Sequence, residues 1–256
     1  MKPETVDKLA ATLAANRALG IVSEFQLDAI ETIADAQALQ SAALEVFCTD
    51  LDGYALVGTN PLCLRSLGLQ RPIFGAIADN AHGPDRAVFH LPKGILGAQC
   101  EFVFRIGRVF PGEGEAIDRV AAANAIVTCQ PAIGLLGRRT LHPPRNDFAA
   151  TADFALHVVT LCGEHAASPN LLALDRIAVE ARLNGQVVAQ APASSILGHP
   201  LDAVVWLATE LGLQGQRLNA GDIVATGSCT PILQVLPGQR LEVNFGPIGE
   251  VRASFS

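Results

Sequence analysis

The feature that most constrains the fold is a series of short apolar runs, each bounded by Gly, Pro or Asn, that begins near residue 51. Such runs are typical of β-strands. They include GYALVG, EFVFRIG, DIVATGS, RIAVEARLNGQVVAQAP and RLEVNFGPIGEVRASFS. One of them contains Asn184-Gly185, the residue pair that most favours a tight turn between two paired strands. The sequence therefore predicts a mostly β domain of mixed sheets over residues 51–256.

Apolar residues recur at helical spacing in three other segments. From about residue 3 to residue 47 this spacing predicts a helical arm, which we assign to residues 1–50. A second helix is expected over residues 113–136, where Pro131 should bend or break it. A third is expected over residues 200–213. The predicted fold class is α+β, with mainly β structure, an N-terminal helical arm and a few packed helices.

Composition excludes several classes of partner. Half of the residues are hydrophobic and 17% are charged, so the chain can bury a large core. A net charge of -7 argues against nucleic acid and against an anionic membrane surface as partners. No apolar run approaches the ~20 residues of a membrane helix. The N-terminus, MKPETVDKLAATLAANRALG, lacks the apolar centre of a secretory signal. The six scattered cysteines are typical of reduced, buried thiols. We expect a cytoplasmic protein.

The last quarter of the chain carries several motifs in close succession. Residues 196–256 contain LG-H-P, A-x-x-W-L-A, L-x-A-G-D-I-V-x-T-G-S-x-T-P and F-G-x-I-G-x-V-x-x-x-F-S. This segment closely resembles the end of the 2-keto-4-pentenoate hydratase family, within the fumarylacetoacetate hydrolase superfamily. Three earlier segments also resemble segments of the family, in the same order: DAQALQSAAL, LQRPIFGAIADN and TADFALHVVTLCGE. The resemblance implies a twisted, partly closed β-roll with the active site at one mouth, in a protein that forms homo-oligomers.

The resemblance also implies acid–base chemistry on a 2-keto or enol acid beside a divalent metal. Mg²⁺ or Mn²⁺ would polarise the keto acid, so that a dienol or enone can be protonated and then take up water. Members of the family supply three carboxylates for the ion. Two form an E-x-E pair on one strand, and the third stands at the end of the following helix. A lysine in a G-[YF]-K-I-G motif lies near the site.

This sequence departs from that pattern at most of the metal positions. The E-x-E pair corresponds to Gln99 and Glu101, the third carboxylate to Gly134 and the lysine to Ala55. Each lost carboxylate removes an attraction of roughly 4 kcal/mol at ~4 Å and an effective dielectric of about 20, before desolvation is subtracted. Glu101 is the one carboxylate left as a candidate ligand. The cofactor is therefore unknown: Mg²⁺ or Mn²⁺ by resemblance, but with binding expected to be lost or weak.

Other candidate site residues follow from the resemblance and from residue chemistry. The candidate catalytic groups are Asp79, Glu101 and His157. The candidate substrate-binding residues are Thr59, Asn60, Arg138, Arg139 and Ser228. Ser228 follows a glycine turn whose backbone N–H groups could hold a carboxylate.

Several of these candidates have ordinary structural alternatives. Asp79 could cap a turn, Thr59 and Asn60 could cap a helix, and His157 could be a satisfied core histidine. For Arg138 and Arg139 the hypothesis is functional: an arginine there could bind an acidic ligand directly through its planar guanidinium and replace the metal as the positive partner.

Two functions remain open on these grounds. The first is an enzyme of the hydratase and decarboxylase group, acting on a 2-keto or enol acid in the catabolism of aromatic compounds. On the same scaffold, a metal-independent lyase, tautomerase or cyclase could use Asp79 or His157 as a base and turn amides as oxyanion donors. The second is a non-catalytic relative that serves as a binding module or as the oligomer partner of an active paralogue. In both, the expected ligand is a small acidic or keto-acid molecule.

Overall fold

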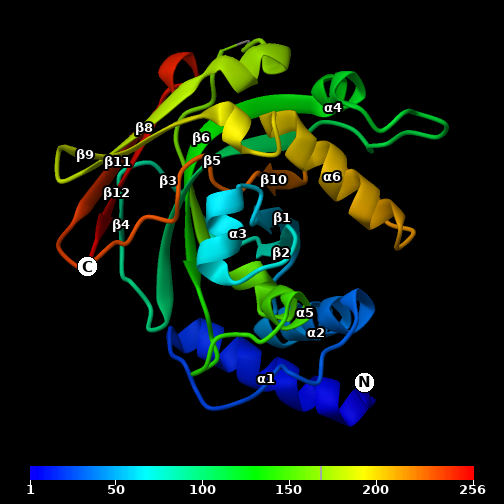
Figure 1. The fold of residues 1–256 in the computed structure, drawn as a ribbon. Helices are drawn as coiled ribbons and strands as arrows, with labels where there is room; N and C mark the ends of the chain where they lie inside the picture. Colours follow the sequence, from blue (N-terminus) through cyan, green and yellow to red (C-terminus); the bar gives the residue numbers. More distant parts are fainter. Residues whose placement is uncertain (168) are drawn as a thin grey trace.

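Two mixed β-sheets curve around a shared apolar core (Figure 1). The computed structural model describes residues 1–167 and 169–256. The first sheet has the order β2 (Ile73–Ala78), β1 (Leu51–Val57), β10 (Ile223–Ala225), β5 (Ile95–Ile106), β6 (Ile126–Gly137), β7 (His157–Cys162) and β3 (His82–Pro84). The second has the order β4 (Ala87–Phe89), β12 (Glu250–Phe255), β11 (Arg240–Asn244), β8 (Ala178–Leu183) and β9 (Gln186–Pro192). The predicted α+β architecture is confirmed.

The hairpin predicted from Asn184-Gly185 joins β8 to β9. Leu183 pairs with Gln186 across the turn. Asn184 and Gly185 have φ angles of 51° and 82°, the left-handed conformation that a two-residue hairpin turn requires at both positions. The Asn184 side chain also accepts a 2.8 Å hydrogen bond from the Arg240 N–H, which ties the turn to β11.

The N-terminal arm consists of two helices, α1 (Pro3–Leu19) and α2 (Ile33–Phe47). They pack against each other and against α5 (Asp147–Ala152), at the end of the molecule drawn lowest in Figure 1. Apolar residues of α1 and α2, among them Leu13 and Leu39, share a buried cluster with Phe154 of the β-domain. Two further helices are the short α3 (Pro61–Leu67) and the longer α6 (Pro200–Gly212), which the sequence predicted. Among the described residues, no helix is long and apolar enough to cross a membrane.

The prediction of a helix over residues 113–136 is wrong for most of that segment. Only α4 (Arg119–Ala125) is helical, and strand β6 follows it directly. Residues 131–137 of β6 are all buried, so both faces of this part of the strand are covered and the sequence does not alternate as a half-exposed strand would. Pro131 has no N–H for a helical hydrogen bond and stands opposite Phe102 in the sheet. Gly134 therefore lies on a strand and not at the end of a helix.

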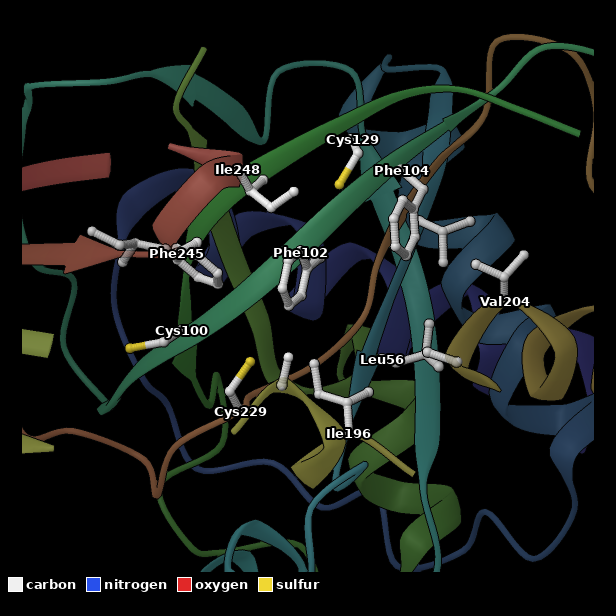
Figure 2. Close-up of a cluster of buried hydrophobic side chains, with 14 of the residues drawn as sticks. Leu56, Cys100, Phe102, Phe104, Cys129, Ile196, Val204, Cys229, Phe245 and Ile248 are labelled. Carbon is white, nitrogen blue, oxygen red and sulfur yellow. The ribbon is translucent and has the colours of Figure 1, made fainter. Parts of the chain in front are cut away.

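Strand β5 separates the core from the opposite face of the first sheet. Figure 2 shows Cys100, Phe102 and Phe104 of β5 among the side chains of the main core cluster. The Phe102 ring meets the Phe245 ring edge to face, with 5.0 Å between the ring centroids. Successive residues of a strand point to opposite faces, so Gln99 and Glu101 point away from this core.

Candidate functional site

Gln99 and Glu101 form a fully buried polar pair on the face of β5 that lies opposite the core. The Gly227 N–H donates a 2.9 Å hydrogen bond to Glu101 Oε2, and Gln99 Nε2 lies 3.4 Å from the same oxygen. Among the described residues, neither Glu101 Oε1 nor Gln99 Oε1 has a hydrogen-bond partner. Buried acceptors normally have a donor, so these two oxygens without partners identify a candidate functional site.

Burial sets the protonation of Glu101. It raises the pKa of this carboxyl to about 8, and the hydrogen bond from Gly227 only partly opposes that effect. At neutral pH the side chain is therefore mainly a neutral carboxylic acid, which can donate a proton or a hydrogen bond.

Gly134 explains how Glu101 fits into this position. In the sheet, Gly134 stands opposite Gln99 on the neighbouring strand. A Cβ atom on residue 134 would lie 2.0 Å from Glu101 Oε1 and 3.5 Å from Gln99 Nε2. The carboxyl of Glu101 thus occupies the space that a side chain at 134 would need.

This donor set does not fit a divalent-metal site of the kind that the resemblance implies. Gln99 offers an amide oxygen, Glu101 a largely protonated carboxyl and Gly134 no side chain. In the part of the chain that the structure describes, no group of three or more His, Cys, Asp or Glu residues is arranged to hold an ion. Mg²⁺ and Mn²⁺ favour several anionic oxygen ligands, and of these three positions only Glu101 can supply one.

His157 lies on β7, two strands away from β5 in the first sheet. Its Nε2 atom lies 2.9 Å from Thr160 Oγ1, and Thr160 stands opposite Gly134 in the sheet. Burial, followed by the positive charges of Arg17 and Arg139, lowers the pKa of His157 well below its usual value. The imidazole is therefore neutral, and its Nδ1 atom has no partner among the described residues. Residue order alone gave no signal for Thr160, since it became relevant only through its position in the sheet.

Thr59, Asn60 and Ser228 hold residues 226–230 beside β5. The Thr59 hydroxyl donates to the Thr226 carbonyl at 2.9 Å, and Asn60 Nδ2 donates to the Cys229 carbonyl at 2.8 Å. The Ser228 hydroxyl accepts a 3.1 Å hydrogen bond from the Cys100 N–H. Asn60 also caps α3, as its alternative interpretation predicted. These contacts aim the Gly227 N–H at Glu101, while contact of the three side chains with substrate stays a prediction.

The guanidinium of Arg139, a candidate ligand-binding group, is engaged within the protein, and its contact with a ligand stays a prediction. Its guanidinium forms a buried ion pair with Asp153 at 3.2 Å and also donates to the backbone carbonyl of Gly137 at 2.9 Å. The Arg139 N–H donates to the other Asp153 oxygen at 2.9 Å. Arg138 differs: it is half-buried, forms no ion pair among the described residues and lines a cavity.

Asp79 lies apart from the buried pair. It is exposed in the turn after β2, where it accepts a hydrogen bond from the Thr49 hydroxyl and its N–H donates to the Asp50 carbonyl at 3.0 Å. No hydrogen bond among the described residues joins it to Glu101. Its catalytic role stays a prediction. Ala55, at the position of the family's lysine, is buried in an apolar cluster with Val103 and other small side chains.

Comparison with known proteins places these residues in a family context. A model of the family described as fumarylacetoacetate (FAA) hydrolase C-terminal matches residues 67–256. A 2-keto-4-pentenoate hydratase from Paraburkholderia xenovorans is 29% identical over 202 residues, which cover 77% of this chain and 73% of the relative. A 4-oxalocrotonate decarboxylase from Pseudomonas putida is 28% identical over 195 residues, which cover 75% of this chain and 72% of the relative.

Solved structures show the same fold. The 4-oxalocrotonate decarboxylase from Pseudomonas putida G7, complexed with magnesium and adipate, superimposes with a TM-score of 0.87 at 24% identity and covers 100% of this chain and 99% of that one. The fumarylpyruvate hydrolase from Pseudomonas aeruginosa, in complex with Mn²⁺ and pyruvate, superimposes with a TM-score of 0.60 at 13% identity, over 79% of this chain and 88% of that one. The fold predicted from the resemblance is confirmed, and divalent metals occur in these structural neighbours.

Proposed function

The chain belongs to the fumarylacetoacetate hydrolase family, and from this we propose that it is a hydratase-like lyase acting on a 2-keto or enol acid without the family's divalent ion. Its curated relatives include 2-keto-4-pentenoate hydratases and 4-oxalocrotonate decarboxylases. The observation that carries the proposal is Glu101, a buried carboxyl with one oxygen held by the Gly227 N–H and the other oxygen without a protein partner.

The chemistry of hydration assigns distinct tasks to the side chains. Adding water across a dienol or enone requires a proton to be delivered to carbon and another to be taken from water. Neutral Glu101 can deliver the first proton, and the buried, neutral His157 is the candidate base for the second. The Gln99 amide can donate a hydrogen bond to a substrate oxygen. Because Gln99, Glu101 and His157 are all buried, substrate can reach them only if the segments covering them move.

A specific observation favours a second function, a non-catalytic protein that binds a ligand or supports an active paralogue. The metal and lysine positions carry Gln99, Gly134 and Ala55, and each of these residues is fully packed. A protein that no longer needs catalytic activity could replace its catalytic groups with packed, uncharged residues in this way.

An assay of 2-hydroxypenta-2,4-dienoate loss, followed by absorbance, separates these functions. The protein is tested with EDTA, with Mg²⁺ and with Mn²⁺, beside Glu101→Gln and a matched control, Glu45→Gln, at an exposed position. The metal-independent lyase is supported if the wild type turns over substrate in EDTA, if Glu101→Gln abolishes this turnover and if Glu45→Gln preserves it. Turnover that requires the ion contradicts it, and no turnover under any condition supports the non-catalytic function.

We also propose the cellular setting that the relatives' names and the resemblance suggest: catabolism of aromatic compounds, in the cytoplasm, by a homo-oligomer. We place the boundary between the helical arm and the β-roll near residue 50, since α2 ends at Phe47 and β1 begins at Leu51. Light scattering during gel filtration tests the oligomer, and limited proteolysis near residue 50 tests the boundary.

A further inference from the structure

A second place in the molecule has the properties of a ligand site. A cavity of about 570 Å³ lies where the end of α1 meets the segment after β4, the end of β6 and the start of β7. Neither Gln99, Glu101 nor Gly134 lines it. Its volume falls within the roughly 300–1,000 Å³ that small-molecule sites usually have.

The charges around this cavity are all of one sign. Arg17, Lys93 and Arg138 line it together with His90, and no Asp or Glu is among its described lining residues. This is unusual in a chain with a net charge of -7. Arg139 also contributes to the wall, but its charge is balanced by Asp153.

Three of these cations, Arg17, Lys93 and Arg138, form no ion pair within the described residues. Arg17 still feels the negative charge of Asp153, the carboxylate that pairs with Arg139. The Arg17 guanidinium donates to the backbone carbonyls of His157 and Val158 at 3.0 and 3.3 Å, which satisfies its hydrogen bonds but leaves its charge. The buried Nε atom of Arg138 has no hydrogen-bond partner. Arg17 and Arg138 are partly buried, and partly buried cations are costly without a counter-charge, so their arrangement favours an anion; the exposed Lys93 adds positive charge beside them.

The frame of the cavity is fixed by hydrogen bonds between its segments. Asn16 Nδ2 of α1 donates to the Arg139 carbonyl at 2.9 Å. The Lys93 N–H donates to the Gly20 carbonyl at 2.9 Å, and the Arg138 N–H donates to the Gly94 carbonyl at 3.0 Å. The cationic side chains therefore extend from a cross-linked frame, which lowers the conformational entropy that a ligand must overcome.

The rest of the wall is apolar and defines the body of the ligand. Phe47, Phe89, Leu91, Val158 and Val159 line the cavity beside the cations. An inorganic ion would leave these side chains uncovered. A molecule with a carboxylate and an apolar portion would cover them.

We propose that this cavity binds a small organic acid, with the carboxylate on the Arg138 guanidinium near Lys93 and Arg17 and the apolar body against Phe47 and Phe89. A guanidinium matches a carboxylate with two parallel N–H···O hydrogen bonds. The site is separate from Glu101 and does not depend on the proposed lyase activity.

Calorimetric titration of the full chain with 3-phenylpropionate and with its neutral analogue 3-phenylpropanamide tests the assignment. The acid is expected to bind at least about tenfold more tightly than the amide, because charge-assisted hydrogen bonds are roughly twice as strong as neutral ones. Arg138→Gln and Lys93→Gln should each weaken the binding of the acid, and Arg138→Gln should lower the affinity by at least about tenfold. Arg217→Gln, which removes an exposed arginine outside the cavity, should leave the affinity unchanged.

Three results would overturn the proposal: no binding of the acid at millimolar concentration, equal binding of acid and amide, or unchanged affinity in both Arg138→Gln and Lys93→Gln. Lys93 is exposed, so Lys93→Gln keeps the test decisive if Arg138→Gln does not fold. Glu101→Gln should retain the wild-type affinity for the acid. If Glu101→Gln abolished binding of the acid, the acid would be assigned to the buried Gln99–Glu101 pair, and the proposal of a separate site would be contradicted. Acid binding without any turnover would remove the lyase proposal and leave this one standing.

Discussion

Glu101 and Gly134 fit together as a pair: the carboxyl of one fills the space that a side chain on the other would need, with only 2.0 Å between Glu101 Oε1 and a Cβ placed on residue 134. The two residues come from neighbouring strands, β5 and β6, and their fit makes the polar site of this chain different from a cage of carboxylates.

Gly134→Ala should destabilise the fold by roughly 1–3 kcal/mol, the usual cost of overpacking. The added methyl forces the Glu101 carboxyl to rotate and give up the Gly227 hydrogen bond. Gly212→Ala is the matched control, because a Cβ there meets no atom within 4 Å. Denaturant unfolding of both variants measures the difference. In a Glu101→Ala background the penalty for Gly134→Ala should largely vanish, and a penalty that persists would show that the clash lies elsewhere.

Gln99→Glu should create metal affinity where the wild type has little. Two carboxyls side by side repel each other when ionised, so this variant should melt at a lower temperature than wild type in EDTA. Mn²⁺ should restore much of that loss, because a ligand that binds only the folded state raises the melting temperature. Thermal melts at increasing Mn²⁺ check both effects. A wild-type protein that gains as much from Mn²⁺ as the variant does would contradict the expectation.

Asp153→Ala should be strongly destabilising, by roughly 3–5 kcal/mol, because it leaves the Arg139 charge buried without a partner. The comparable change at an exposed pair is Asp28→Ala, which breaks the contact with Arg145 and should cost at most about 1 kcal/mol. Urea unfolding of the two variants gives the comparison. Equal losses would mean that the Arg139–Asp153 pair contributes no more than a surface contact.

His157 should make the protein less stable in mild acid. Burial and the neighbouring Arg17 and Arg139 lower the pKa of His157 well below 6.5, so the folded state keeps a neutral ring. The unfolded state takes up a proton below its own pKa of about 6.5, so unfolding binds protons and stability falls as the pH drops below that value. His157→Gln should reduce this slope, measured by urea unfolding between pH 5 and 8, while His165→Gln, at an exposed loop position, should not. An unchanged slope in His157→Gln would assign the acid sensitivity to other groups.

Much of the fold could be predicted from local sequence. Apolar runs bounded by turn residues gave the strands, Asn184-Gly185 gave the hairpin, and residues 200–213 gave α6. The segment that became β6 was misread because a strand covered on both faces does not alternate. From sequence alone, the length and the apolar residues of this segment fit a helix. Only its pairing with β5 and β7 identifies it as a strand.

The site was only partly predictable, for a related reason. The motifs located Gln99, Glu101 and Gly134, but not the close contact between Glu101 and Gly134, which depends on strand register. Arg139 looked like a ligand residue because its partner, Asp153, is identified only by the folded chain. Arg17 was missed because it reaches His157 across 140 positions of sequence, and α1 itself carries no motif.

The alternation along β5 also limits how this protein can change. Odd-numbered residues of the strand build the polar pair, and even-numbered residues build the aromatic core. Adding or deleting one residue would exchange Glu101 with Phe102, which would place an acid among phenyl rings and a phenyl ring beside Gly134. The chemistry of this face can therefore be rewritten one side chain at a time, whereas the length of the strand must stay as it is.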